Sequence, residues 1–182
     1  AEYLTWMAAW WGLEYRMSAA DSLAIAKQYP LSRPEFNNSS AAAFIRADAD
    51  FNVICPVQRL ARALSTPRRG SSATEVWVYS FAHGPTACDE ASVEGVLPVD
   101  QSVKSGWASH ASDVLFTFDS DELVPSARLA CPFTKAEQAL SERMMTLWAS
   151  FTAHGIPNAA GAPEWPQFLS SGASGQVLQL DT

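Results

Sequence analysis

Apolar residues recur at helical spacing in five segments of the chain. The clearest segment covers residues 134–154, where apolar residues three or four positions apart define one inner face. That face consists of Leu140, Met144, Leu147, Trp148 and Phe151. Thr134 is placed to cap this helix, Glu137 completes a capping box, and Gly155 ends the helix. The pattern predicts four further helices, over residues 2–15, 18–28, 40–49 and 53–64.

The predicted helix over residues 53–64 has its apolar positions on one side. These positions are Val53, Val57, Leu60 and Leu64. Pro56 falls in the first turn, where proline is tolerated because the missing N–H would have no partner there. The preceding residues, 50–52, read Asp-Phe-Asn and are expected to form a turn.

Only two segments have the pattern of β-strands. Residues 76–81 carry bulky side chains on both faces, which is typical of a strand inside a sheet that is covered on both sides. Residues 177–180 are expected to form a terminal edge strand. Two short strands cannot form a stable covered sheet alone. The pattern therefore predicts one flank of a larger α/β sheet whose other strands lie elsewhere.

The composition narrows the class of partner. With 48% hydrophobic and 17% charged residues the chain is expected to be globular. The net charge of −7 argues against nucleic acid, since phosphate binding requires clustered Lys and Arg. No apolar run is long enough to span a bilayer. The three cysteines have no C-x-x-C spacing, which argues against a zinc site.

Several motifs occur in the order found in the last part of type-B carboxylesterases, the cholinesterase-like family of α/β-hydrolases. Residues 50–56 (DFNVICP) resemble the start of a family helix, and residues 76–83 (VWVYSFAH) resemble its last long central strand. Residues 106–113 (GWASHASD) resemble G-x-x-H-G-x-E, and residues 140–158 resemble L-S-x-x-M-x-x-Y-W-x-x-F-x-x-x-G-x-P-N. The resemblance implies that residues 1–182 form a single partial α/β-hydrolase domain, the C-terminal portion, completed by another chain.

The resemblance also implies a catalytic histidine, His110, at the end of a long loop over residues 84–109. Trp107 either lines a substrate pocket or packs in the core. Asp113 stands where the family has glutamate, and we expect it to orient the loop that carries His110. Ala111 replaces a family glycine. Because alanine tolerates positive φ poorly, we expect the backbone there to differ slightly from the family's.

The nucleophile of such an enzyme is absent. An α/β-hydrolase orders its triad as Ser, acid, His, with the serine in G-x-S-x-G. Neither residues 70–73 (GSSA) nor residues 172–175 (GASG) fit that motif, and in the family the acid also lies upstream. We therefore expect a two-chain ester hydrolase, whose N-terminal chain holds the serine, the acid and the oxyanion hole. The resemblance implies a small ester substrate and no metal or cofactor. The alternative is a non-catalytic cholinesterase-like module with a structural or adhesion role.

Other polar residues have mainly structural interpretations. His83 matches a family position that is not catalytic, and His154 lies in a last helical turn, where it suits the helix dipole. Asp50 is either a turn residue or half of a buried ion pair with Arg59 or Arg62.

The cysteines and two sequons bear on the compartment. Cys88 and Cys131 bracket the His110 loop and are either bridged or two free thiols. Cys55 is expected to be buried or bonded to the missing part. Overlapping Asn-x-Ser sequons at Asn37 and Asn38 favour glycosylation and a secreted or extracytoplasmic location. The first residues lack the features of a signal peptide, and the absence of an initial Met suggests a processed product.

Overall fold

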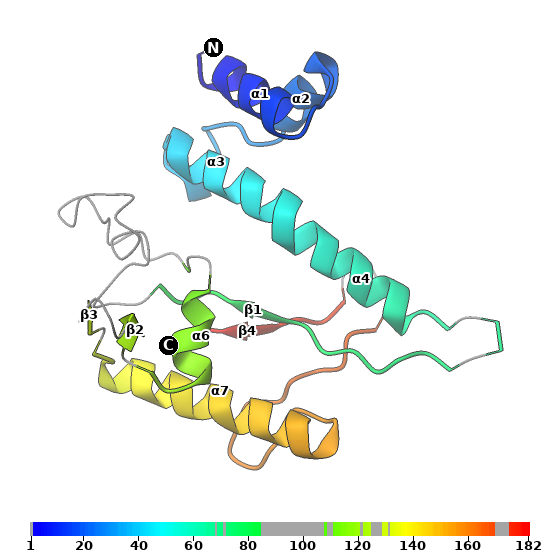
Figure 1. Cartoon of the computed structure of the whole chain (residues 1–182), viewed down its shortest axis with the longest axis vertical. Helices are drawn as coiled ribbons and strands as arrows, with labels where there is room; N and C mark the ends of the chain where they lie inside the picture. Colours follow the sequence, from blue (N-terminus) through cyan, green and yellow to red (C-terminus); the bar gives the residue numbers. More distant parts are fainter. Residues whose placement is uncertain are drawn as a thin grey trace. The chain divides into compact units, whose positions relative to one another are not determined.

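The structure is a computed structural model of the 182-residue chain. It describes residues 2–67, 69–70, 72–84, 108, 111–120, 122–124, 129–130, 132–169 and 175–182. The chain divides into two compact units, Ala1–Leu60 and Ala61–Thr182, and each has a core of its own (Figure 1).

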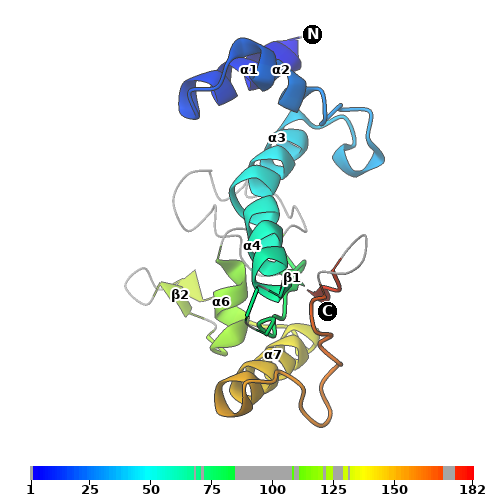
Figure 2. The ribbon, with the colours of Figure 1, turned by 90° about the vertical axis from the view of Figure 1, so that its right-hand side faces the viewer.

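The first unit is entirely helical. In chain order it contains α1 (Glu2–Glu14), α2 (Ala19–Ala26), η1 (Pro34–Phe36), α3 (Ser40–Ala49) and η2 (Asp50–Ile54), which leads into α4 (Cys55–Ser65). The hydroxyl oxygen of Ser18 caps α2 by accepting a hydrogen bond from the Asp21 N–H at 3.1 Å. Helices α1 and α2 lie side by side (Figure 2), and Met7, Trp11, Ala26 and Ala47 are fully buried in this core. The helices predicted for this region are confirmed.

The prediction of a turn at residues 50–52 is wrong. These residues continue the helix as the π-helical turn η2, in which the Cys55 N–H donates to the carbonyl of Asp50, five residues earlier. Asp and Asn usually favour turns because their side chains compete for nearby backbone groups. Here other side chains occupy them: Asp50 accepts from Arg46 and Tyr29 at 3.0 Å each, and Asn52 donates to Asp48 at 2.9 Å.

The apolar side of the next helix does not face a core among the described residues. Val53, Val57 and Leu60, here called the α4 stripe, are 52%, 43% and 59% exposed, and Leu64 is also exposed. Ala61, which lies beside this stripe on α4, is buried with Val78 and Phe168. The predicted apolar residues do lie on one side of the helix, but among the described residues they are not packed against a core, as such a row normally is.

The second unit contains a short parallel sheet. Strands β1 (Tyr79–Phe81) and β4 (Leu178–Leu180) pair in parallel with Ser80 opposite Gln179. The strand predicted over residues 76–81 is thus shorter than expected, although Trp77 makes an isolated bridge to Gln167. A second pair, β2 (Glu122–Val124) with β3 (Leu129–Ala130), is antiparallel and was not predicted.

One edge of β1 has no strand beside it among the described residues. The Val78 carbonyl accepts from Leu178, and the Ala82 N–H donates to Leu180, so these residues face β4. Because backbone groups alternate along a strand, those of Tyr79 and Phe81 point to the opposite edge. The sheet order of the described residues is β1-β4 alone, which leaves that edge open.

The long helix α7 (Lys135–His154) carries the core of the second unit. The predicted capping box is confirmed: the Glu137 N–H donates to the Thr134 hydroxyl at 3.2 Å, and the Thr134 N–H donates to the Glu137 carboxylate at 2.7 Å. Its inner face buries Leu140, Met144 and Leu147 completely. The last member of the predicted face, Phe151, is half exposed, and its ring meets that of Trp77 edge-on. Within the described residues, no helix combines the length and the apolar character needed to cross a bilayer.

Candidate functional site

The region just after the predicted catalytic histidine is held by one short hydrogen bond. The Tyr79 hydroxyl, on β1, donates to Oδ2 of Asp113 at 2.6 Å. Asp113 lies in the first turn of α6 (Ser112–Thr117). The tyrosine ring is itself fixed by edge-on contacts with Trp148 and Trp165, at 4.9 and 5.7 Å between ring centroids. Burial, followed by the hydrogen bond to Asp113 and its charge, raises the pKa of Tyr79 well above its usual value.

Ala111, which stands where the family motif has glycine, has a left-handed backbone. Its φ and ψ are 61° and 7°, in the left-handed region, and its carbonyl accepts from the Val114 N–H at 3.0 Å. The expectation that the backbone here differs slightly from the family's stays a prediction. A left-handed alanine costs about 1–2 kcal/mol, so surrounding contacts must hold it there. The turn from Ala111 to Val114 is therefore formed without glycine.

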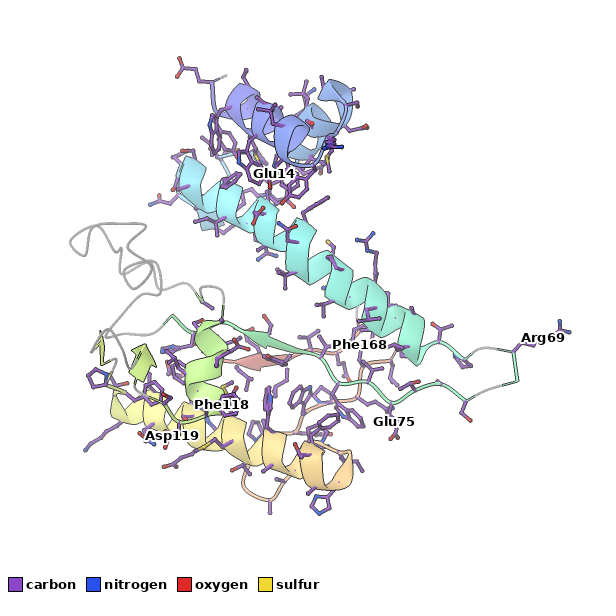
Figure 3. The ribbon with its side chains drawn as sticks, in the orientation of Figure 1. Glu14, Arg69, Glu75, Phe118, Asp119 and Phe168 are labelled. Atoms are coloured by element: carbon purple, nitrogen blue, oxygen red, sulfur yellow. The ribbon has the colours of Figure 1, made fainter. Side chains whose placement is uncertain are left out.

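Both ends of α6 are anchored in the second unit. At its start, Ser112 is buried. Beyond its end, one carboxylate oxygen of Asp119, a residue labelled beside α7 in Figure 3, accepts from Gln138 at 3.0 Å and from Ser141 at 3.2 Å. Between these ends, Phe116 is fully buried and stacks on Phe133 at 4.6 Å. The helix is thus a rigid support for the residues that precede it.

A second polar group lies inside this unit and joins three elements. His83 follows β1 and is 9% exposed. One ring nitrogen, Nε2, lies 3.0 Å from the buried carboxylate of Glu137, and Nδ1 lies 3.3 Å from that of Asp181, just after β4. The Thr182 hydroxyl oxygen also lies 3.4 Å from Nδ1. Among the described residues no cluster of His, Cys, Asp and Glu could hold a metal ion.

The role of His83 was missed by sequence reasoning, which assigned it only a non-catalytic place. Glu137 lies 54 residues from His83, and Asp181 lies 98 residues from it. The available signal was the buried position of Glu137: a capping-box glutamate uses one oxygen for the cap and leaves the other free for a partner.

Several predicted site residues lie outside the described residues. These are His110, Trp107, Cys88 and Cys131, together with nearly all of the loop over residues 84–109. Asn37 and Asn38 are described, and both are exposed with positive φ values of 44° and 60°. His154 is exposed in the last turn of α7, as its structural interpretation requires.

Two structural expectations in the first unit need correction. Asp50 pairs with Arg46, one turn earlier in the helix, and not with Arg59 or Arg62. The continuous helix explains this partner, because residues four apart lie on the same face. Cys55 is exposed with a free thiol in the described part of the chain, so the first alternative, burial there, is wrong, whereas the second, a bond to the missing part, stays a prediction.

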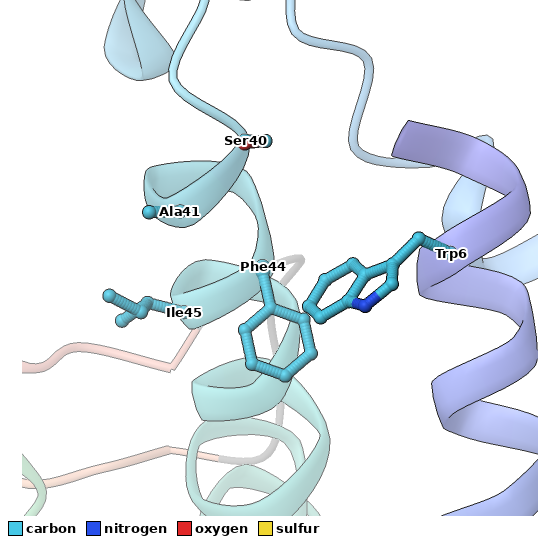
Figure 4. A pocket seen from close by; sticks show the side chains of 5 residues that line it. All are labelled: Trp6, Ser40, Ala41, Phe44 and Ile45. Atoms are coloured by element: carbon cyan, nitrogen blue, oxygen red, sulfur yellow. The ribbon is translucent and has the colours of Figure 1, made fainter. Parts of the chain in front are cut away.

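The first unit also has an open apolar concavity of about 350 Å³ (Figure 4). It is lined by Trp6, Ser40, Ala41, Phe44 and Ile45. The rings of Trp6 and Phe44 meet edge-on at 5.1 Å. No acid, base or nucleophile pair converges on it, so this concavity is not the candidate active site.

Residues 12–182 match the carboxylesterase family, and the chain belongs to that family. Its fold class is therefore that of the α/β-hydrolases, of which the short parallel sheet and flanking helices form a part. The chain is similar to rat acylcarnitine hydrolase, with 37% identity over 120 residues, and to mouse acylcarnitine hydrolase, with 33% identity over 138 residues. It is also 30% identical to human cocaine esterase over 119 residues.

These matches cover much of this chain but little of the relatives. The rat protein matches 66% of this chain and 18% of its own length, and the mouse protein matches 76% and 20%. For human cocaine esterase the shares are 65% and 18%. The chain thus spans about a fifth of the length of these relatives, in line with a partial hydrolase domain.

Proposed function

We propose that this chain is the histidine-bearing portion of a serine carboxylic-ester hydrolase. Its serine, acid and oxyanion hole lie on a separate N-terminal polypeptide. The observation that supports the catalytic part is the local structure after residue 110: Ala111 has a left-handed backbone, and the Asp113 carboxylate accepts a short hydrogen bond from Tyr79. Membership of the carboxylesterase family supports the ester-hydrolase class.

In this proposal His110 moves a proton in each half of the reaction. It takes the proton from the partner's serine as that oxygen attacks the ester carbonyl, and then gives it to the departing alcohol. Water enters next, and His110 takes its proton while the water oxygen attacks the acyl-enzyme. The proton returns to the serine as the carboxylic acid leaves. Both steps use acid–base chemistry of this chain and a nucleophile of the partner.

The open edge of β1 supports the need for a second polypeptide. Strands buried on both faces of an α/β sheet normally have neighbours on both sides. Tyr79 and Phe81 direct their backbone groups to an edge that no described strand occupies. A parallel strand of the partner would satisfy those groups and extend the sheet.

The α4 stripe supports the same partner. Val53, Val57 and Leu60 offer an exposed apolar row, the kind of surface that marks a protein interface. The occupant that we propose is the remainder of the hydrolase domain, since the chain spans about a fifth of the length of its relatives. In an α/β fold, helices cover the faces of the sheet with such rows.

A co-expression experiment tests this proposal. The chain is produced with the N-terminal polypeptide of its carboxylesterase, and hydrolysis of a short p-nitrophenyl ester is measured for the wild type and for His110→Ala. We expect a stable complex whose turnover is abolished in the variant, whereas the control His154→Ala, at an exposed histidine in the last turn of α7, retains it. Undiminished turnover in His110→Ala contradicts the catalytic role. A chain that purifies as a solitary 19.7 kDa monomer beside the expressed partner contradicts the two-chain assembly.

The second candidate is a non-catalytic module that acts as a structural or adhesion subunit. The departures at Ala111 and Asp113 from the family's glycine and glutamate favour it. An organophosphate probe separates the two candidates, because it labels only an activated serine. Labelling of the partner polypeptide in the complex supports the enzyme, and an unlabelled but intact complex supports the module.

Two further features belong to the same proposal. We propose a bridge between Cys88 and Cys131 that restrains the loop before His110. The exposed positions of Asn37 and Asn38 support glycan attachment and therefore a secreted or extracytoplasmic protein. Intact-mass measurement with and without reductant and with and without glycosidase checks both.

A further inference from the structure

We propose that Tyr79 is a positioning residue for His110. Its hydroxyl holds Asp113, and Asp113 in turn fixes the start of α6, directly after the backbone that carries the histidine. This inference rests on the proposed esterase function. It adds to that function a specific residue on a different element, 34 positions away from Asp113 in the chain.

The first step concerns how firmly Tyr79 is held. Its backbone is part of β1, in register with Leu178 of β4. Its ring contacts Trp148 of α7 and Trp165 edge-on, and the Trp165 indole N–H donates to the Val78 carbonyl at 3.0 Å. Since strand, helix and loop all restrain this ring, its hydroxyl has little freedom. A rigid donor is what a positioning residue requires.

The second step follows the constraint along the chain. The O–H···O distance of 2.6 Å is that of a strong bond to a charged acceptor. Asp113 also accepts at its backbone carbonyl from the Thr117 hydroxyl at 2.9 Å, so both its side chain and its main chain are fixed. Two residues earlier Ala111 is held in the left-handed region. The turn that leads out of residue 110 is therefore specified by contacts and not by glycine.

The third step is electrostatic. Three chain steps limit the Cα atoms of residues 110 and 113 to about 11 Å of separation, and in this proposal the Asp113 charge acts on the imidazole of His110. The hydroxyl of Tyr79 partly offsets that charge by donating to it. The raised pKa of Tyr79 keeps the hydroxyl protonated throughout the range in which a histidine titrates. Without the Tyr79 hydroxyl, the negative charge of Asp113 is no longer partly offset. Without the Asp113 carboxylate, the imidazole loses the stabilising effect of that charge.

This reasoning predicts opposite pH shifts for two variants of the same bond. An unopposed Asp113 carboxylate in Tyr79→Phe stabilises the imidazolium, so the acid limb of kcat/KM moves to higher pH. The neutral amide in Asp113→Asn removes that stabilisation, so the limb moves to lower pH. A residue with only a packing role would shift neither limb.

The experiment uses the assembled two-chain protein and a short p-nitrophenyl ester. Each single variant is expected to lower kcat about tenfold with KM nearly unchanged, since a misplaced catalytic group costs rate rather than binding. The double variant is expected to be no worse than the poorer single variant, because both remove one interaction. Tyr15→Phe, which removes a hydroxyl in the first unit, is the control and should leave kcat unchanged.

The outcomes separate this inference from the function on which it rests. An assembled wild type with no turnover overturns both. Active wild type with additive losses in the double variant, or with acid limbs that do not move apart, overturns the role of Tyr79 alone. The melting temperature of each variant is measured in parallel. Asp113→Glu, which keeps the carboxylate, should recover most of the rate that Asp113→Asn loses.

Discussion

Helices α4 and α7 carry similar rows of apolar residues, but the row on α7 is buried and the row on α4 is exposed. On α7, Leu140, Met144 and Leu147 are fully buried against α6 and the sheet. On α4, the stripe of Val53, Val57 and Leu60 remains largely exposed. The spacing of apolar residues therefore predicts which side of a helix packs against other residues. It does not predict whether those residues belong to the same chain. The contrast is what a piece of a larger sheet domain would show.

The largest expected effect tests this contrast directly. In the chain alone, Leu147→Ala should lower the free energy of unfolding by about 3 kcal/mol, because it opens a cavity in a closed core. Leu60→Ala should change it by less than about 0.5 kcal/mol, because the side chain is already in water. Urea denaturation followed by tryptophan fluorescence measures both.

The same pair sharpens the comparison once the partner is added. If the partner covers the α4 stripe, Leu60→Ala should then weaken the complex, and its cost should approach that of Leu147→Ala. Equal losses for the two variants in the chain alone would mean that α4 is already covered, and would contradict the contrast.

A smaller effect concerns how α7 begins. Thr134→Ala removes the acceptor of the capping box and should destabilise the second unit by about 1 kcal/mol. Thr146, on the exposed side of the same helix, is the matched control, and Thr146→Ala should be neutral or slightly stabilising. Thermal unfolding monitored by circular dichroism distinguishes the two. Equal melting temperatures for both variants would show that the cap contributes nothing.

The smallest effect appears at alkaline pH in the first unit. Burial and the Asp50 carboxylate raise the pKa of Tyr29 from 10.0 to about 12. The unfolded chain therefore loses this proton first, and the free energy of unfolding falls as pH rises from about 10 to about 12. Tyr29→Phe should reduce that fall without abolishing it, since burial also raises the pKa of Tyr3. Urea midpoints between pH 9 and 12 provide the measurement, and an identical slope in the variant would refute it.

Much of the helical fold could be predicted from local pattern. Caps such as Ser18 and Thr134 act within three residues, so the sequence displays them directly. The turn expected at residues 50–52 failed because Arg46 and Tyr29 engage the side chain of Asp50. Tyr29 follows α2, 21 residues before Asp50 in the chain. A contact between residues so far apart cannot be predicted from local residue spacing.

The candidate site divides in the same way. The family resemblance pointed to His110, Ala111 and Asp113 from a contiguous motif. The partner of Asp113 could not be predicted, because Tyr79 stands on a distant strand and a strand pattern indicates which face a residue occupies but not what it meets. The left-handed Ala111 was also missed, since backbone preference alone disfavours it and tertiary contacts prevail.

The π-helical turn η2 has a consequence for the phase of the helix that contains it. An extra residue in one turn rotates everything downstream by about 100° relative to an unbroken α-helix. The seam formed by Ala43 and Ala47 upstream is therefore out of phase with the seam formed by Val57 and Leu60 downstream. One continuous rod thus presents two seams in different directions, each free to serve a different neighbour.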